Sequence, residues 1–392
     1  MLEIDNDIKK SKSKSVLIVS NCTWYLYNFR YKLLDDLKNK GFKLILISPL
    51  DEYYSEISKF FFKKENLFLV RGSENPLIEI ITLLHLFFIY LKYKPILVHH
   101  FTIKPCIYGG FVSRLLGIKN TINHITGLGP SFYSNRLKIK YVNKILKPFY
   151  KYAFNNNKNN IINIFHNNSD KNTLIKKLIT KKENTQIIKG SGVDIDYFKK
   201  EVLVNFDEST KLLFPARLIK EKGIIELINA CNELWNENYK FTLNIAGEID
   251  KQNRSHLNNK YFKFIHKNPN IKLLGKCSDM KKVYKKMDIV ILPSWREGLS
   301  KALLESAAMS LPIITTNVPG CKDIIDNNYS GLLVPVRNEE KLKFAIKKYL
   351  DNPEIAIKYG ENARKTVCSK FTIQIINKKI LKIYEEFLNI DK

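Results

Sequence analysis

LPSWREGLSKALLESAAMSLPIITTNVPG, residues Leu292–Gly320, is the stretch that decides the fold of this chain. The apolar run Asp288–Leu292 that leads into it has the length of a buried parallel strand. Ser300 is placed to cap a helix over Lys301–Ser310, and Pro312–Thr316 is expected to be the next strand. A strand, a loop, a helix and a second strand in this order predict a parallel sheet covered by helices.

Two glutamates in this stretch, Glu297 and Glu305, lie eight positions apart. Five residues of helix rise about 7–8 Å, which is roughly the length of a diphosphate. The amides of residues 299–302 could bind that diphosphate at the start of the helix, and Gly298 would let the backbone come close. Glu305 would then suit a ribose diol and Glu297 the hydroxyls of a sugar. The alternative is that both glutamates are solvated surface residues.

The same stretch resembles the E-x7-E segment of the retaining family-4 glycosyltransferases. Other segments of that family follow in the right order, and in the second half of the chain they are Lys189–Phe198 (KGSGVDIDYF), Pro215–Gly223 (PARLIKEKG), Asn244–Glu248 (NIAGE) and Ile271–Met280 (IKLLGKCSDM). In the first half, Arg71–Pro76, Phe101–Gly110 and Ile125–Tyr133 are similar to a narrower subgroup. Its members extend undecaprenyl-diphosphate-linked sugars, and they include N-acetylgalactosaminyltransferases that act on a bacillosamine-type acceptor.

This resemblance implies an α/β fold of two facing Rossmann-like domains, the GT-B architecture, with a C-terminal helix that returns to the first domain. The expected domains are an acceptor-binding and membrane-facing domain over residues 16–200 and a nucleotide-sugar-binding domain over 201–371. The crossover helix follows over 372–392. Residues 1–15 are polar and are expected to form a disordered leader. In the first domain we expect strands over Val16–Ser20, Lys43–Ser48, Leu67–Val70 and Ile96–His99.

Length and composition agree with a two-domain protein. A chain of 392 residues exceeds one ordinary domain, and its 45% hydrophobic and 26% charged residues are ordinary for a globular protein. Its six cysteines are scattered without a metal-binding spacing, which indicates free thiols in a reducing compartment. No secretory signal is visible, and the longest apolar run, Leu77–Leu91, is too short to span a bilayer. We therefore expect a cytoplasmic protein.

The positive charge is unevenly distributed. The formal net charge is +27, and no Asp or Glu occurs from Ile80 to Ser169, where twelve Lys or Arg occur. This pattern favours a phosphate-rich substrate or an anionic membrane surface, although a lysine-coated surface would also produce it. Within this region, Asn135–Phe154 is basic, aromatic and amphipathic. We expect it to attach the first domain peripherally to the inner face of the cytoplasmic membrane.

The resemblance assigns roles to individual residues. Catalysis is expected of Arg217, Lys222 and Glu297, since an Arg fork and a Lys point charge suit a diphosphate. Donor binding is expected of Glu305, Gly298, Leu299, Ser300, Leu274, Gly275 and Thr126. A rim that contacts the acceptor is expected at His100, Thr102, Lys104 and Arg71. His124, two residues before Thr126 in the same strand, is expected to serve packing.

The function that these observations favour is transfer of a hexose or N-acetylhexosamine from a nucleoside-diphosphate sugar, with UDP as the expected nucleotide. The acceptor would be a lipid-diphosphate-linked saccharide in the synthesis of a bacterial capsule, lipopolysaccharide or O-antigen. The resemblance implies that the anomeric configuration is retained. We expect no metal ion to be needed, because no D-x-D pattern is placed for one, and we expect no other cofactor. The alternatives are a UDP-sugar epimerase on the same architecture and a basic nucleic-acid-binding protein, although no nucleic-acid-binding motif is present.

Overall fold

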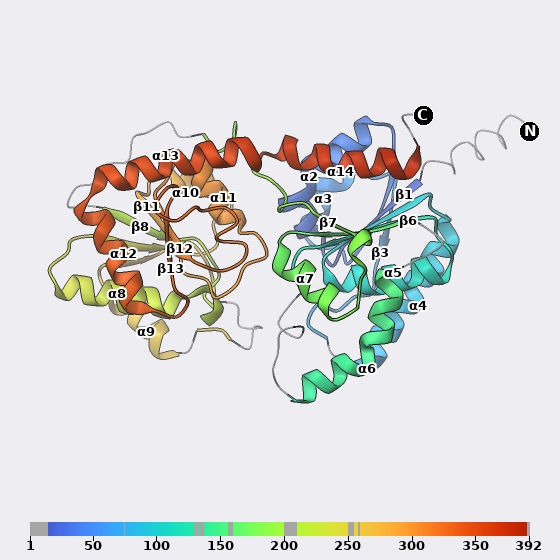
Figure 1. Ribbon diagram of the computed structural model, residues 1–392, viewed down its shortest axis with the longest axis horizontal. Helices are drawn as coiled ribbons and strands as arrows, with labels where there is room; N and C mark the ends of the chain where they lie inside the picture. The colour runs from blue at the N-terminus through green and yellow to red at the C-terminus, as the bar shows by residue number, and fades with distance from the viewer. Residues whose placement is uncertain are drawn as a thin grey trace, which may run out of the picture. The chain divides into compact units, whose positions relative to one another are not determined.

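The computed structural model describes residues 15–73, 75–128, 132, 137–155, 160–199, 210–249, 255–257 and 259–389 (Figure 1). Almost all of the expected leader, residues 1–15, lies outside these residues, and so do residues 200–209 at the expected domain boundary. The chain forms two units: unit 1 contains Met1–Ser191 and Ile376–Lys392, and unit 2 contains Gly192–Ile375. The sequence analysis placed these divisions after residues 200 and 371.

The described residues of unit 1 form a seven-stranded parallel sheet in the order β3-β2-β1-β4-β5-β6-β7. The strands are β1 (Ser15–Val19), β2 (Lys43–Ser48), β3 (Lys63–Asn66), β4 (Leu97–Phe101), β5 (Asn120–Ile125), β6 (Asn160–Phe165) and β7 (Thr185–Ile187). The strand expected over residues 67–70 is wrong, because the charged segment Lys63–Asn66 pairs with β2 instead. This segment is an edge strand, and exposed lysines suit a strand that pairs on one side only.

Helices cover both faces of this sheet. They are α2 (Thr23–Asn39), α3 (Tyr54–Ile57), α4 (Pro76–Tyr93), α5 (Ile103–Leu115), α6 (Leu137–Phe154), α7 (Asn168–Lys176) and α14 (Ile373–Leu388). Successive residues of a strand point to opposite faces. Val16 and Ile18 of β1 accordingly pack with α2 and α14, whereas Leu17 and Val19 pack with α4 and α5.

The C-terminal helix belongs to unit 1, as the sequence analysis predicted. In α14, the Tyr384 hydroxyl lies 2.9 Å from Nδ1 of His99 in β4. Asn377 donates to Asp36 of α2 at 2.6 Å, and Glu385 pairs with Lys40 at 2.9 Å. These contacts and the apolar packing of the helix close the α2 face of the sheet.

In unit 2, the described residues form a six-stranded parallel sheet in the order β10-β9-β8-β11-β12-β13. Its strands are β8 (Lys211–Phe214), β9 (Thr242–Ile245), β10 (Ile271–Leu273), β11 (Ile289–Leu292), β12 (Ile313–Thr316) and β13 (Leu332–Val334). Its helices are α8 (Ile224–Asn236), α9 (Asn259–Lys267), α10 (Met280–Tyr284), α11 (Lys301–Ala308), α12 (Glu339–Asp351) and α13 (Pro353–Lys370). The prediction of two Rossmann-like domains is thus confirmed.

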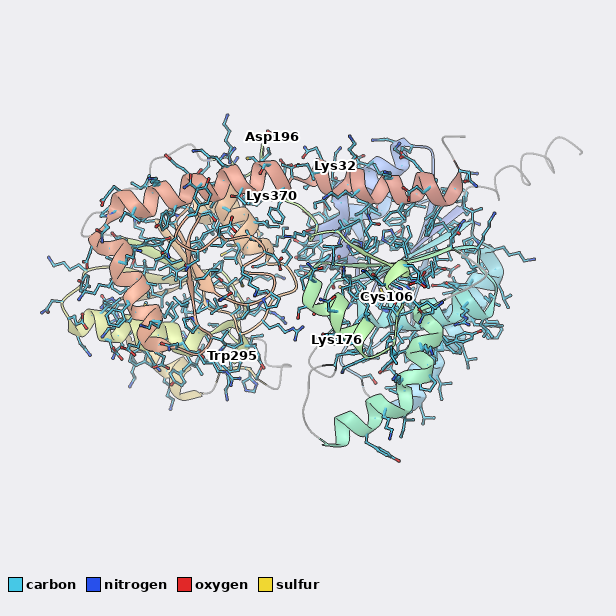
Figure 2. All side chains as sticks on the ribbon, viewed as in Figure 1. Lys32, Cys106, Lys176, Asp196, Trp295 and Lys370 are labelled. Atoms are coloured by element: carbon cyan, nitrogen blue, oxygen red, sulfur yellow. The ribbon has the colours of Figure 1, made fainter. Side chains whose placement is uncertain are left out.

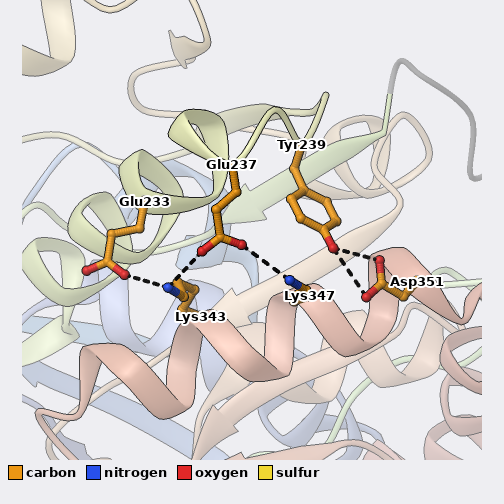
Figure 3. Close-up of polar contacts among 6 residues, drawn as sticks. All are labelled: Glu233, Glu237, Tyr239, Lys343, Lys347 and Asp351. Atoms are coloured by element: carbon orange, nitrogen blue, oxygen red, sulfur yellow. Dashed lines mark hydrogen bonds and ion pairs between the residues drawn. The ribbon is translucent and has the colours of Figure 1, made fainter.

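A row of polar contacts joins α8 and its C-terminal turn to α12 (Figure 3). Lys343 lies 2.8 Å from Glu233 and 2.9 Å from Glu237, and Lys347 lies 3.3 Å from Glu237. At the end of the row, the Tyr239 hydroxyl donates to Asp351 at 3.0 Å. Exposed pairs of this kind contribute little to stability, so the row fixes helix register more than it strengthens the unit.

The winding of each sheet reverses between its two central strands. In unit 1 the reversal lies between β1 and β4, and in unit 2 it lies between β8 and β11. Ligands of open parallel sheets bind beyond the carboxyl ends of the strands at this switch point. The loops that follow β8 and β11 therefore define the place to look for a site in unit 2.

Candidate functional site

The loop after β8 packs directly on the loop after β11. Gly223 has φ +74°, and a Cβ atom there would lie 2.1 Å from the carbonyl oxygen of Pro293. The amide of Trp295 donates to the carbonyl of Glu221 at 2.8 Å. Glycine at position 223 thus allows two backbone segments from opposite sides of the switch point to touch.

This contact brings Lys222 and Glu297 together. Nζ of Lys222 lies 2.5 Å from Oε1 of Glu297, and the Ser294 hydroxyl donates to the same oxygen at 2.7 Å. The two side chains are 21% and 11% exposed, so the pair borders solvent but is largely shielded from it. A carboxylate and an ammonium held in this way can each exchange one contact for a ligand group of opposite charge.

Arg217 lies in the same loop as Lys222, and its side chain is exposed. The segment after β9 packs closely under it, since a Cβ at Gly247 would lie 1.9 Å from the carbonyl oxygen of Ala216. The structure therefore places both predicted cations at the carboxyl end of the central strand β8. Arg and Lys side chains in one segment can bind an anionic group such as a phosphate.

Helix α11 begins where the sequence analysis placed it, with the Ser300 side chain accepting from the Leu303 amide at 3.4 Å. The first amides of a helix find their acceptors outside it, and a helix start is for this reason a common place for anions to bind. Leu299 and Gly298 precede the cap in the half-buried part of the loop. These positions form a short amide-lined segment next to Glu297.

Glu305 is buried on the first turns of α11. The Tyr284 hydroxyl donates to its Oε2 at 3.1 Å, and Nζ of Lys301 lies 3.4 Å from its Oε1. Burial raises the pKa of Glu305, while Lys301 and the Tyr284 hydrogen bond act in the opposite direction. Sequence reasoning missed Tyr284, because α10 is a short helix whose contact with α11 has no local signal.

Two further residues fix the loop that carries Glu297. Gly320 has φ +83°, and a Cβ there would lie 2.6 Å from the carbonyl oxygen of Glu297 and 2.7 Å from that of Gly298. Trp295, labelled in Figure 2, donates from Nε1 to Glu226 at 2.8 Å, and Cζ of Arg337 lies 3.8 Å from its ring centroid. Trp295 therefore holds the loop in place.

Leu274 and Gly275 follow β10 at the same edge of the sheet. The amide of Leu274 donates to the carbonyl of Ile245 at 2.8 Å, and its side chain is exposed. Gly275 has φ +67°, a conformation that side chains other than glycine seldom adopt. Their place at the end of the outer strand suits a contact with the nucleotide base.

Two of the four residues predicted for the acceptor rim, Arg71 and Lys104, are described here together with Thr126, which was predicted for donor binding. All three lie in unit 1, with Lys104 in the first turn of α5 and the other two outside its helices and strands. Arg71 is exposed, and Thr126 is half-buried just after β5. Lys104 is engaged, because its ammonium lies 2.7 Å from Glu79 and donates to the carbonyls of Val70 and Ser73 at 2.9 Å each. Lys104 thus ties the loop over residues 70–73 to α5.

The other two predicted rim residues follow one another closely at the end of β4. His100 is fully buried, with Nε2 2.8 Å from the Tyr90 hydroxyl and Nδ1 2.7 Å from Oδ1 of Asn123. The expectation that it lines the rim is therefore corrected to a place in the core. Thr102 has φ +71°, a strained backbone for threonine, and its buried hydroxyl makes no hydrogen bond with the described residues.

A buried arginine lies beneath this edge of unit 1, and sequence reasoning missed it. Arg30 of α2 is 1% exposed and donates to the Tyr25 hydroxyl at 3.0 Å. Its Nη2 lies 3.0 Å from Nε2 of His124 and 3.4 Å from Nε2 of His166, and its guanidinium lies 5.2 Å from the centroid of the Phe101 ring. Nη1 has no hydrogen-bond partner among the described residues.

The histidines around Arg30 are neutral at physiological pH. Burial lowers the pKa of His166 to about 3 and that of His100 to about 4, and the positive charge of Arg30 adds to the shift at His166. The pKa values of His99 and His124 are also well below the usual range, first because of burial and then because of Arg30. The cluster therefore carries the single positive charge of Arg30 near the ends of β4, β5 and β6.

Two family descriptions match the chain in succession. "Glycosyl transferase 4-like" matches residues 15–167, and "Glycosyl transferases group 1" matches residues 196–366. The first match lies within unit 1 and the second within unit 2. The chain belongs to the glycosyltransferase family built from these two domains, as its sequence motifs predicted.

Relatives over nearly the whole chain act on lipid-linked sugars. The chain is 24% identical to the N,N'-diacetylbacillosaminyl-diphospho-undecaprenol alpha-1,3-N-acetylgalactosaminyltransferase of Campylobacter jejuni, over 93% of this chain and 96% of that protein. It is 25% identical to the UDP-Gal:alpha-D-GlcNAc-diphosphoundecaprenol alpha-1,3-galactosyltransferase of Escherichia coli, over 89% and 90%. The capsular polysaccharide biosynthesis glycosyltransferase CapM of Staphylococcus aureus is 30% identical, but only 45% of this chain and 46% of CapM align.

Solved structures show the same fold. A glycosyltransferase from Rickettsia africae has a TM-score of 0.73 at 22% identity and covers 96% of this chain and 99% of its own. Anabaena Alr3699/HepE, in complex with UDP and glucose, has a TM-score of 0.72 at 16% identity and covers 94% and 99%. At these identities the likeness establishes the GT-B architecture alone.

Replacing Glu297 by Gln should lower turnover by about two to three orders of magnitude, because it removes contacts that are strongest in the transition state. The measurement is the rate of UDP release at saturating donor and acceptor. Glu340→Gln, on the exposed start of α12, is the matched control and should leave the rate unchanged. Wild-type turnover by a folded Glu297→Gln protein would remove Glu297 from the site.

Replacing Glu305 by Gln should act mainly on donor affinity. A hydrogen bond to a charged, buried carboxylate is worth about 1–3 kcal/mol, so the donor should bind roughly ten- to a hundredfold more weakly. Titration of the protein with the nucleoside diphosphate, followed by calorimetry, measures this loss. Unchanged affinity, with Glu340→Gln again as the control, would argue against a contact between Glu305 and the donor.

Unit 1 should lose stability as the pH falls from about 6.5 to 5. Its buried histidines have lowered pKa values in the folded state, so only the unfolded chain takes up their protons in this range. Each such histidine removes about 1.4 kcal/mol of stability per pH unit. Urea denaturation, monitored by hydrogen exchange in β4–β6, should show this loss of stability. In the variant His100→Gln, the free energy of unfolding should fall less per pH unit. Equal stability at pH 7 and pH 5 would contradict the neutral cluster.

Proposed function

We propose that this glycosyltransferase transfers a hexose or N-acetylhexosamine from a UDP sugar to a lipid-diphosphate-linked saccharide, with retention of anomeric configuration. The observation that carries the proposal is the meeting of Lys222 and Glu297 at the switch point of unit 2. Arg217 and Lys222 both follow β8, and Glu297 and Glu305 lie on either side of the start of α11. One short edge thus offers cations for a diphosphate and carboxylates for hydroxyl groups.

The chemistry asked of these residues is stabilisation of a leaving group. As the bond between the sugar and the diphosphate breaks, negative charge grows on the departing phosphate oxygen. In this proposal Arg217, Lys222 and the first amides of α11 donate to that charge, and electrostatic stabilisation of this kind is usually the largest single contribution to catalysis. In the front-face mechanism implied by the family resemblance, the departing phosphate then takes the proton of the acceptor hydroxyl.

In the proposed mechanism, Glu297 orders Lys222 and also accepts hydrogen bonds from the donor sugar. In the absence of donor it holds Lys222 through an ion pair, and Ser294 orients the same carboxylate oxygen. When the diphosphate binds the ammonium group of Lys222, the ion pair opens, and the Glu297 carboxylate can accept hydrogen bonds from the sugar hydroxyls. The pair therefore keeps both side chains in place before the substrate arrives, which lowers the cost of ordering them.

Metal independence is part of the proposal. Many nucleotide-sugar enzymes neutralise the diphosphate with a divalent cation, but here two side-chain cations already follow β8. A metal ion beside Arg217 and Lys222 would meet like charge. Among the described residues no group of three metal-ligating side chains gathers, at this edge or elsewhere.

The acceptor is proposed from the relatives, whose names specify undecaprenyl-diphosphate-linked saccharides. Such a lipid stays in the bilayer, so the enzyme has to work at the membrane surface. On α6, Tyr141, Val142, Ile145 and Leu146 are exposed rather than packed in the core, and Lys144 is exposed among them. Of the other predicted basic residues, Arg136, Lys138 and Lys140 lie outside the residues whose side chains are described. We propose that α6 attaches unit 1 to the anionic cytoplasmic face of the membrane.

The rival activity, epimerisation of a UDP sugar, needs an available carboxylate at the strand ends of unit 1. Among the described residues, the carboxylates that follow these strands include Asp51 and the exposed Glu52 after β2, and Asp170 after β6. Asp51 accepts from the Trp24 amide at 2.9 Å and from the Thr23 hydroxyl, while Asp170 is buried beside the Asn167 cap of α7. Because Asp51 and Asp170 serve local structure, transfer is favoured over epimerisation.

A screen for UDP release tests the proposal. UDP sugars and other nucleotide sugars are offered with short-chain lipid-diphosphate saccharides, and release should occur with a UDP sugar and should need the acceptor. Proton NMR of the product should show the same anomeric configuration as the donor, and EDTA should not change the rate. Inversion, loss of activity in EDTA, or release without acceptor from every donor would each contradict the corresponding part of the proposal.

A further inference from the structure

Helix α4 exposes a continuous apolar stripe on the surface of unit 1. Its members, which recur three or four residues apart along the helix, are Leu77, Ile80, Ile81, Leu84, Phe88 and Leu91. Their exposed fractions run from 42% at Leu91 to 70% at Leu77. We call these six residues the α4 stripe. A row of large apolar side chains facing water over a whole helix is unusual for a protein that stays in solution, and it marks an interaction surface.

The opposite face of α4 is part of the core. Thr82, Leu86, Ile89 and Tyr90 are buried, and the last three pack with β1, β2 and α5. By length and composition alone, α4 is the one described helix that could cross a membrane. Crossing would pull these residues out of the core and break the hydrogen bond between Tyr90 and His100. The geometry therefore fits a helix that lies flat with one face in unit 1.

Two carboxylates near the stripe are each paired with a lysine. The single carboxylate of the helix, Glu79, is neutralised by Lys104 at 2.7 Å, and Glu65 is neutralised by Lys92 at 2.7 Å. From Ile80 onward the sequence contains no acid until after Ser169. Apolar side chains whose neighbouring carboxylates are paired, in a stretch of sequence with twelve Lys or Arg and no acid, suit the surface of an anionic bilayer.

The stripe and α6 belong to one side of unit 1. Helix α5 packs on α4 and also on α6, and all three follow one another along the sheet (Figure 1). α6 adds the exposed side chains of Tyr141, Val142 and Ile145, with Lys144 beside them. Two kinds of surface thus lie on neighbouring helices: α6 is basic and amphipathic, whereas the exposed face of α4 is mainly apolar.

We propose that the α4 stripe inserts into the boundary between headgroups and acyl chains of an anionic membrane, and that it is the apolar anchor of unit 1. This inference rests on the proposed function in assuming a lipid-linked acceptor. It adds that attachment does not depend on charge alone. The lysines of α6 supply attraction that salt weakens, whereas insertion of α4 supplies binding that salt does not weaken.

Vesicle sedimentation tests this division. The variant Leu77→Ser/Leu84→Ser/Phe88→Ser removes three exposed side chains and leaves the buried face of α4 intact. Each large apolar side chain that leaves water completely contributes about tenfold or more to partitioning. In 0.5 M salt, binding of this variant to vesicles of phosphatidylcholine and phosphatidylglycerol should be at least about tenfold weaker than that of the parent protein.

Two further variants serve as controls. Leu178→Ser/Tyr329→Ser/Phe344→Ser removes three comparably exposed apolar side chains away from α4 and should bind as the parent does. Lys144→Gln/Lys147→Gln/Lys151→Gln should lose binding at low salt and keep the salt-resistant part. Unchanged binding of the α4 variant in high salt would overturn the proposal, and so would an equal loss in the control of exposed apolar residues.

Depth is measured separately with brominated lipids. Tryptophan placed at Leu84 or Phe88 should be quenched by bromine near the headgroup end of the acyl chain, and tryptophan at Phe344 should not be quenched. If the stripe instead joins two copies of the chain, the serine variant will change the mass measured by light scattering and leave lipid binding intact. That result would also overturn the proposal.

Activity separates this inference from the proposed function. With a water-soluble, short-chain acceptor, the α4 variant should keep the parent rate, because no residue of the stripe belongs to the site of unit 2. With the long-chain acceptor in vesicles its rate should fall with its binding. A parent protein that releases UDP from no donor would refute the proposed function, and the vesicle and quenching results would still decide whether α4 meets lipid.

Discussion

A backbone contact between Gly223 and Pro293 sets the geometry of unit 2. Any side chain at position 223 would overlap the carbonyl oxygen of Pro293, so the contact exists only because residue 223 is glycine. Through it, the segment that follows β8 rests on the segment that follows β11, and Lys222 comes within 2.5 Å of Glu297. Gly320 makes a second close backbone contact, in which it packs against the carbonyl groups of Glu297 and Gly298. Two glycines thus hold a charged pair that neither strand could place alone.

Unit 1 contains a buried charged side chain, Arg30, in its interior. Arg30 has no carboxylate among its hydrogen-bond partners and is surrounded by a tyrosine, an aromatic face and neutral imidazoles. Isolating a guanidinium in this way costs several kcal/mol unless its surroundings are polar and well oriented. The histidines offer lone pairs without adding negative charge. A net positive field therefore persists at the ends of β4, β5 and β6, where the strained Thr102 also lies.

The sequence predicted those features that depend on local rules. The cap at Ser300 and the strand at Ile313–Thr316 follow from spacing and residue type within a few positions. The roles of Arg217 and Lys222 came instead from the family resemblance and stay a prediction. The third strand was misplaced, because Lys63–Asn66 has no apolar pattern and becomes a strand only by pairing with β2. His100 was expected at the surface, since a strand end does not reveal whether Tyr90 and Asn123 cover it. Arg30 could have been found, because it stands on the apolar face of α2 between Leu26 and Leu34.

The path of the chain has a consequence for how the protein is made. The chain leaves unit 1 after residue 191, builds the whole of unit 2, and only then supplies α14 to unit 1. Tyr384 is made 285 residues after its partner His99, and Asn377 is made 341 residues after its partner Asp36. Unit 2 is continuous and is complete earlier than its partner, although unit 1 is begun first. During synthesis the apolar α2 face of unit 1 stays uncovered for most of translation, and a nascent chain in this state is a natural client of chaperones that shield exposed apolar surface.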